Sequence, residues 1–192
     1  MLKRAFLALA IAAAATVPAF AHLDPTEHGS LAAGFSHPLF GLDHILAMVA
    51  VGLWAAQQGG RTVWLVPAAF VGTMIIGFAA AILGMPLPFV EPVILASVIF
   101  IGIAVALAMP VPTPAVAAAV AFFAFFHGHA HGGELGTAGA WQFAAGFVVA
   151  TALLHVLGVG LGLMFSRLGG KILSRVLGAA TALGGLFLAF GA

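Results

Sequence analysis

The sequence predicts an all-α membrane protein: a polytopic bundle of six transmembrane helices that follows a cleaved signal peptide. Only 6% of the 192 residues are charged and 64% are hydrophobic, whereas about 25% of an ordinary soluble domain is charged. A soluble fold of this length cannot bury that much apolar surface. The apolar runs are continuous over about 20 residues and do not alternate, which is the pattern of membrane helices. The lipid bilayer is therefore the expected environment.

The N-terminus has the three regions of a secretory signal peptide. Positive residues occupy 3–4, an apolar stretch covers 5–17, and Ala-Phe-Ala at 19–21 fits the small-x-small cleavage pattern. Cleavage after Ala21 would give a mature chain that begins at His22, whose α-amine and imidazole can together chelate a metal ion. The alternatives are an uncleaved anchor helix and, for the residues after His22, a solvated terminal tail.

The mature chain, residues 22–192, is expected to form a single transmembrane domain. Its apolar segments are separated by connectors rich in glycine and proline, which mark the ends of helices. We expect the six spans to cover 38–57, 63–84, 92–109, 114–130, 138–165 and 171–190.

The charged residues predict how the bundle is oriented. A cleaved signal peptide places the mature N-terminus outside the cytoplasm, so that six spans bring the C-terminus to the same, periplasmic side of a bacterial inner membrane. Every basic residue of the mature chain then faces the cytoplasm, as the positive-inside rule requires. The acidic residues and seven of the eight histidines lie toward the outer side. The basic residues are Arg61, Arg167, Lys171 and Arg175, and the acidic ones are Asp24, Glu27, Asp43, Glu91 and Glu134.

Composition also excludes several kinds of function. A net charge of +1 gives no indication of nucleic-acid binding. Without cysteine there are no disulfides, iron–sulfur clusters or thiolate metal sites. The sequence has no GxxxxGK[ST] phosphate loop, so this chain does not hydrolyse ATP by that route.

The first polar cluster opens the first expected span. Pro38 suits the first turn of a helix and disfavours helical geometry for the residue before it, so His37 is expected at the helix entrance. His37 and His44 are seven residues apart and would share one face, with Asp43 beside them. Asp43 can ligate a cation or orient a ligating histidine. The alternative is a helix cap with a structural hydrogen bond, for which an intramembrane carboxylate is costly.

The second cluster lies at the end of the fourth expected span. On a helix, His127, His131 and Glu134 would share one face, and His129 would point elsewhere. The three glycines between 127 and 134 disfavour a fully regular helix. The alternative is a histidine-rich surface loop.

Imidazole and carboxylate ligands without sulfur suit Ni²⁺, Co²⁺, Zn²⁺ or Fe²⁺. One further histidine, His155, lies well inside the fifth span, one turn after Thr151. It is either a hydrogen-bonded core histidine or an additional metal ligand, deeper along a pathway than the rest.

Both clusters resemble the signature motifs of a known family. HPLFGLDH at 37–44 and FHGHAHGGE at 126–134 are similar to those of the HupE/UreJ family, and the resemblance covers essentially the whole chain. Members are small polytopic membrane proteins associated with hydrogenase and urease gene sets, and are regarded as nickel, sometimes cobalt, permeases. The resemblance implies metal binding by His22, His37, Asp43, His44, His127, His129, His131 and Glu134.

The expected function is uptake of a divalent metal, without enzymatic activity and without a permanent cofactor. The ion, Ni²⁺ or Co²⁺, would be captured by His22 and the second-motif histidines and would then pass to His37, Asp43 and His44. The expected partners are the bilayer and the metal ion. The sequence does not decide whether the protein forms a homo-oligomer or acts with a partner permease subunit. Two alternatives are an intramembrane metalloenzyme and a metal-binding accessory protein that transports nothing.

Overall fold

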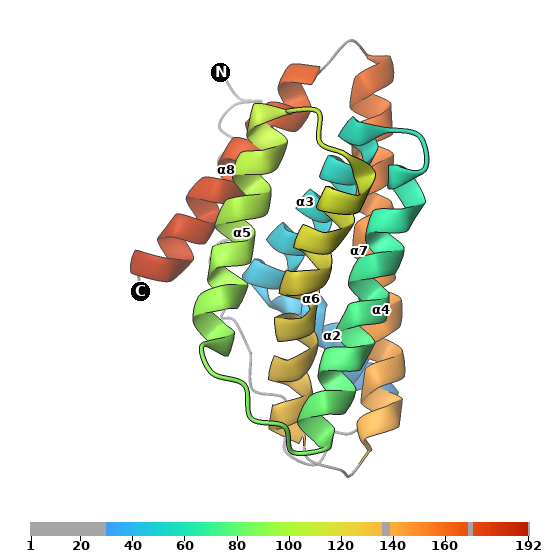
Figure 1. Cartoon of the computed structure of the whole chain (residues 1–192), viewed down its shortest axis with the longest axis vertical. Helices are drawn as coiled ribbons and strands as arrows, with labels where there is room; N and C mark the ends of the chain where they lie inside the picture. The colour runs from blue at the N-terminus through green and yellow to red at the C-terminus, as the bar shows by residue number, and fades with distance from the viewer. Residues whose placement is uncertain (1–29, 136–138, 169–170, 192) are drawn as a thin grey trace, which may run out of the picture.

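The computed structural model describes residues 30–135, 139–168 and 171–191, and within them every regular element is a helix (Figure 1). The expected signal peptide, residues 1–21, and His22 lie outside the described residues. The helices are α2 (Leu31–Phe40), α3 (Leu42–Gln58), α4 (Thr62–Ile82), α5 (Val90–Leu107), α6 (Thr113–Leu135), α7 (Ala140–Arg167) and α8 (Lys171–Phe190).

Five of these helices, α4 to α8, are each long and apolar enough to cross a membrane. The helices α2 and α3 qualify only as a pair, because the chain bends by 82° between them. The expected span over 38–57 therefore consists of parts of two helices, with a bend at Gly41 that the sequence did not predict. The described part of the chain has five clear candidate spans and a sixth that is broken by this bend.

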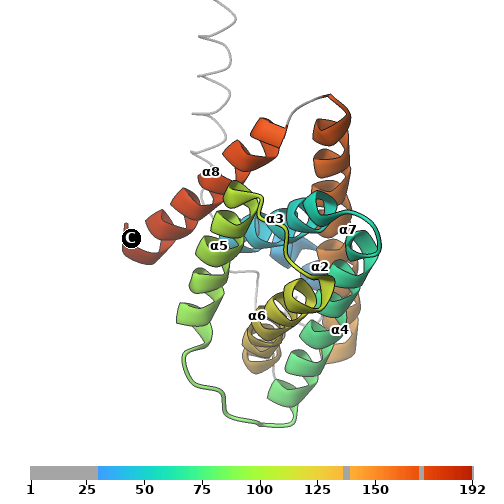
Figure 2. The same cartoon turned by 45° about the horizontal axis from the view of Figure 1, so that its top comes forward.

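The charged residues lie at opposite ends of the bundle. The connections α3–α4 and α5–α6 lie at the same end as the last turn of α7 and the start of α8, and the α4–α5 connection lies at the other end (Figures 1 and 2). Arg61 joins α3 to α4, while Arg167 ends α7 and Lys171 begins α8. Glu91, in the first turn of α5, lies at the opposite end. This arrangement agrees with the charge segregation that the sequence predicts.

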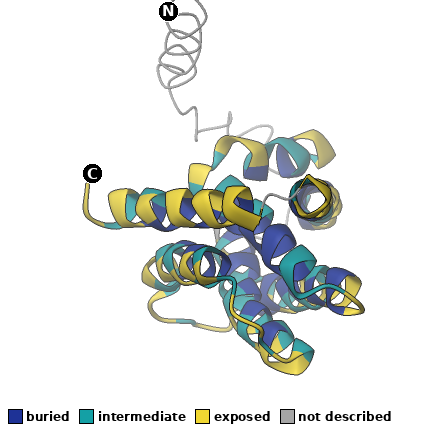
Figure 3. Ribbon diagram, turned by 90° about the horizontal axis from the view of Figure 1, so that it is seen from above, coloured by how far each residue is buried: buried dark blue, intermediate teal, exposed yellow. Residues whose placement is uncertain are grey.

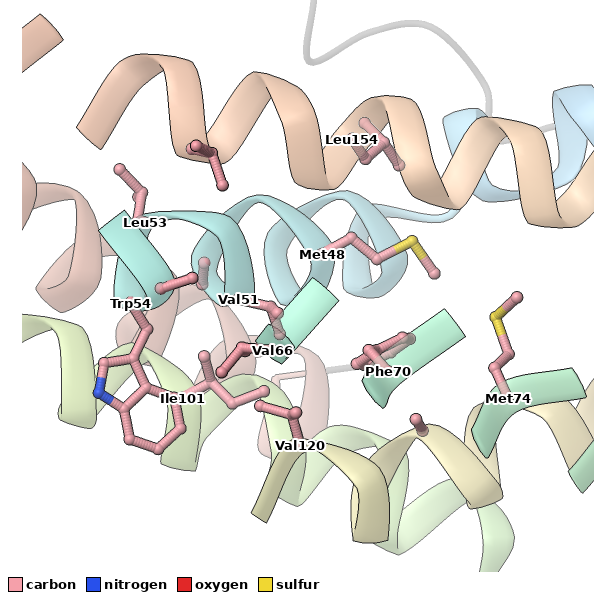
Figure 4. Packing of buried hydrophobic residues seen from close by; sticks show 14 of the residues in the cluster. Met48, Val51, Leu53, Trp54, Val66, Phe70, Met74, Ile101, Val120 and Leu154 are labelled. Carbon is pink, nitrogen blue, oxygen red and sulfur yellow. The ribbon is translucent and has the colours of Figure 1, made fainter. Parts of the chain in front are cut away.

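The central element is α3, in which nine of the 17 residues are buried. Its Met48 and Val51 pack with Phe70 of α4 and Ile101 of α5 in the apolar core (Figure 4). The outer sides of the helices, in contrast, are exposed (Figure 3). Their exposed residues include large apolar ones such as Phe187. A surface of this kind is what contact with lipid requires.

Glycines allow the helices that carry the histidines to approach closely. Between α4 and α6, a Cβ atom at Gly77 would collide with the carbonyl oxygen of Phe125, and one at Gly128 with that of Met74. Between α3 and α7, a Cβ atom at Gly158 would collide with the carbonyl oxygen of Val49. Small residues at such crossings are the usual means of helix association in membranes.

Candidate metal centre

The bend at Gly41 places the residues of the first motif on two different helices. Ser30 begins α2 by accepting a hydrogen bond from the backbone N–H of Ala33 (3.0 Å). The helix then continues through His37 and Pro38, so His37 lies in its last turn. The expectation that His37 opens a span was wrong, because Pro38 removes one N–H from a helix that ends two residues later and does not start a new one.

Gly41 lies at this bend, next to the side chains of Asp43 and His44. Its backbone is extended (φ −82°, ψ 113°) and separates α2 from α3. A Cβ atom on Gly41 would lie 2.8 Å from His44 Nδ1 and 2.9 Å from Asp43 Oδ1. Both distances are shorter than real Cβ contacts, so a larger residue here would displace the side chains of Asp43 and His44.

Asp43 orients His44. Its Oδ1 lies 2.8 Å from His44 Nδ1, and the His44 side chain is almost fully buried. When Nδ1 donates its proton to the carboxylate, the lone pair of the imidazole is on Nε2. A carboxylate that fixes a histidine in this way also makes the free nitrogen a better metal ligand.

The two motifs meet at His44 and His131. Their Nε2 atoms are 2.6 Å apart, although the residues are separated by 87 positions in the chain. His37 completes the group: its ring centroid is 4.4 Å from that of His131 and 5.8 Å from that of His44. Candidate ligand atoms of the three histidines all lie within 4.8 Å of one another.

This triangle has nearly the dimensions of a metal site. Metal–imidazole bonds of about 2.1 Å place two ligand nitrogens on one ion at most about 4.2 Å apart. Small side-chain rotations would therefore bring the nitrogens of His37, His44 and His131 onto one cation. The structure brings residues of both motifs into a single cluster, and the path in which the second motif passes an ion on to the first stays a prediction.

His127 lies one turn deeper on α6 than His131 and is fully buried. Its Nδ1 is 3.0 Å from the carbonyl oxygen of Phe123 and donates to it, so that Nε2 keeps the lone pair. Its ring centroid is 5.6 Å from that of His44. His127 therefore lies next to the three-histidine cluster, on the side farther from the end of α6.

The remaining second-motif residues are placed differently. His129 points away from the cluster and its Nε2 donates to the carbonyl oxygen of Met85 (2.7 Å), as the helical spacing predicts. Glu134 belongs to α6, but its side chain lies outside the described part of the structure. The expectation of an irregular helix was wrong, since α6 is continuous across the motif and Gly128 and Gly132 instead pack against the backbone of α4.

Three aromatic residues that sequence reasoning missed contact the cluster or the neighbouring His127. Phe147 of α7 has its ring centroid 4.7 Å from that of His131, and Phe143 is 5.7 Å from His37. Phe70 of α4 lies 5.5 Å from His127. Phenylalanines in apolar helices carry no sequence signal for such a role, so only the packing identifies them.

The fold and the cluster together define a multi-pass membrane protein with a buried polyhistidine site. The family described as HupE / UreJ protein matches residues 9–188. Protein HupE of Rhizobium leguminosarum bv. viciae is 47% identical over 182 residues, which cover 93% of this chain and 95% of that protein. No solved structure matches the chain. The chain belongs to the HupE/UreJ family.

Proposed function

We propose that this protein is a permease that takes up a divalent transition metal across the bacterial inner membrane. The observation that carries this proposal is the convergence of His37, His44 and His131 inside an apolar helix bundle. Ionisable side chains are costly at such a position and usually mark an ion or substrate pathway. Asp43 would supply negative charge to offset part of the charge of the cation.

Nickel, with cobalt as the other candidate, is the proposed cargo. Imidazole and carboxylate donors accept either metal, so ligand chemistry does not choose between them. The choice rests on the family, whose members the sequence resemblance associates with hydrogenase and urease gene sets. The imported ion would then be inserted into hydrogenase or urease during the maturation of that enzyme.

The proposed direction follows from the charges at the two ends. The end with Arg61 and Lys171 would face the cytoplasm, and both termini would be periplasmic. An ion would enter at the end of the bundle where α6 ends, and His22 and Glu134 stay proposed ligands for its capture. It would then bind between His37, His44 and His131 before moving on, because a transport site must also release its ion.

Nickel accumulation in cells limited for nickel tests the proposal. Cells with His44→Ala should accumulate no more nickel than cells without the protein, while Gly72→Ala should behave as wild type because Gly72 has open space around it. The same variants, purified and reconstituted in liposomes with a nickel-sensitive dye, show whether the single chain transports. Unchanged accumulation in His44→Ala cells would contradict the proposal, and wild-type protein that binds metal without influx would favour an accessory role or an enzyme.

A further inference from the structure

A second group of imidazoles lies deeper in the bundle than the three-histidine cluster. His155 is 15 residues into α7, which corresponds to about 22 Å at 1.5 Å per residue. The side chain is 1% exposed. In comparison, His131 lies about 6 Å and His127 about 12 Å from the end of α6 at the same side of the bundle. From this end of the bundle inwards, the order of the three histidines is therefore His131, His127 and His155.

The burial of His155 has no structural explanation among the described residues. Neither Nδ1 nor Nε2 has a hydrogen-bond partner there, and the same is true of Nε2 of His127. Buried polar atoms are nearly always paired, because an unpaired one loses its hydration without compensation. His127 and His155 thus present three unpaired ring nitrogens in the interior of the bundle.

His127 and His155 contact the same aromatic ring. The ring centroid of Phe70 is 5.5 Å from that of His127 and 4.8 Å from that of His155 (Figure 4 shows Phe70 among the core side chains). His155 also borders an open groove of about 300 Å³ between α4 and α7. Thr151, one turn before His155, lies on the same helix face and hydrogen-bonds Met74 Sδ (3.8 Å).

The geometry points to a second metal station, formed by His127 and His155, below the cluster of His37, His44 and His131. This inference rests on the proposed function and deepens it, since the station would receive the ion from the cluster. The His127 lone pair on Nε2 is set by the bond from Nδ1 to Phe123, which is how protein groups prepare a ligating imidazole. With two imidazoles the station binds more weakly than the upper cluster, and weak binding favours onward release.

Metal stoichiometry tests the station directly. Purified full-length protein in lipid nanodiscs is titrated with Ni²⁺ by calorimetry and with Co²⁺ by absorption. We expect two equivalents in the wild type, and one in His155→Leu with the affinity of the tighter site unchanged. Nickel influx into liposomes should fall at least about tenfold in His155→Leu, a loss of the size seen when supporting metal ligands are removed.

Thermal stability separates a metal ligand from a core histidine. Leucine replaces the unpaired imidazole by an apolar group of similar size, so the melting temperature of His155→Leu without metal should equal or exceed that of the wild type. Leu154→Ala, at a buried neighbour, should lower the melting temperature and keep both equivalents. Two equivalents in His155→Leu, or loss of both equivalents with a lowered melting temperature, would overturn the station.

The two proposals fail in distinguishable ways. If the wild type binds two equivalents but transports none, the permease proposal is overturned and the deep station stands. If the wild type transports nickel and His155→Leu transports it equally well, the station is overturned and the permease proposal stands.

Discussion

His44 and His131 come from motifs 87 residues apart, yet their Nε2 atoms face each other at 2.6 Å. Two imidazole nitrogens at this distance either share one proton or jointly face a cation, because two lone pairs or two N–H groups would repel each other. The relationship depends on helix packing: the bend at Gly41 positions His44, and the close approach of α6 to α4 positions His131.

His131 and His129 lie on the same helix but should contribute differently to nickel accumulation. His131→Ala removes a member of the three-histidine cluster, whereas His129→Ala removes a side chain that bonds the carbonyl of Met85 instead. We expect nickel accumulation to be abolished in the first variant and to stay above about half of wild type in the second, since a single surface hydrogen bond contributes about 1 kcal/mol. Equal loss in both variants would show that the second motif acts as a whole and not through the cluster.

Gly41→Ala should damage the site without unfolding the protein. The added methyl group would lie 2.8 Å from His44 Nδ1 and would displace the side chain from Asp43. We expect a fall of at least about tenfold in nickel affinity, the usual effect of losing the group that orients a metal ligand. The matched control is Gly72→Ala in α4, where an added Cβ meets nothing within 4 Å. Wild-type affinity in Gly41→Ala would contradict the role given to the bend.

Asp43→Asn tests the charge of the orienting group separately from its shape. Asparagine keeps the size of aspartate, but it removes the negative charge and can present an N–H to His44 Nδ1. We expect nickel affinity to fall about 10- to 100-fold, with little change in melting temperature. Calorimetry on the purified variant measures both the affinity and the number of sites, and an unchanged affinity would assign Asp43 a structural role.

Gly128→Leu should act through helix packing alone. A side chain at Gly128 would collide with the backbone of α4 at Met74, and overpacking of this kind typically costs about 1–3 kcal/mol. The melting temperature should therefore fall clearly, with metal binding lost only because α6 moves. Gly133→Leu, on the same helix with open space around it, should melt close to wild type, and equal melting of both variants would argue against the close crossing.

Nickel uptake should decrease as the outside becomes acidic. A metal binds the neutral form of imidazole, and an unperturbed histidine gains a proton near pH 6.5. Uptake should be highest near neutral pH and should fall as the medium is acidified toward about pH 4, because protons compete with the metal for every imidazole nitrogen that ligates it. Uptake from buffered medium at a fixed free-nickel concentration measures this profile, and a flat profile over that range would exclude histidine ligation as the limiting step.

The sequence predicted the helical class, because continuous apolar runs of membrane length allow little else. It also predicted which helix face carries His127 and His131, since that depends only on the helical period. The break at Gly41 was missed because Pro38 suggested a helix start. A bend between two helices leaves no signal in the local sequence. The regularity of α6 was also missed. Glycine disfavours a helix when the sequence is considered alone, but Gly128 allows the close packing of α6 against α4.

The meeting of the two motifs could not be derived from spacing either. Sequence patterns place residues on one helix, but the distance between His44 and His131 depends on how α3 and α6 are arranged about α4 and α7. Phe147 and Phe70 were missed because phenylalanine is common in apolar helices, so no pattern marks the one beside His131 or the one beside His127.

The most direct test of the central claim is to count bound nickel ions in purified wild type, His44→Ala, His131→Ala and the double variant. If the two histidines share one ion, each single variant loses one equivalent and the double variant loses no more than either. If the motifs form separate sites, the losses add and the double variant lacks two equivalents. The first result would support a single site built from both motifs, and the second would contradict it.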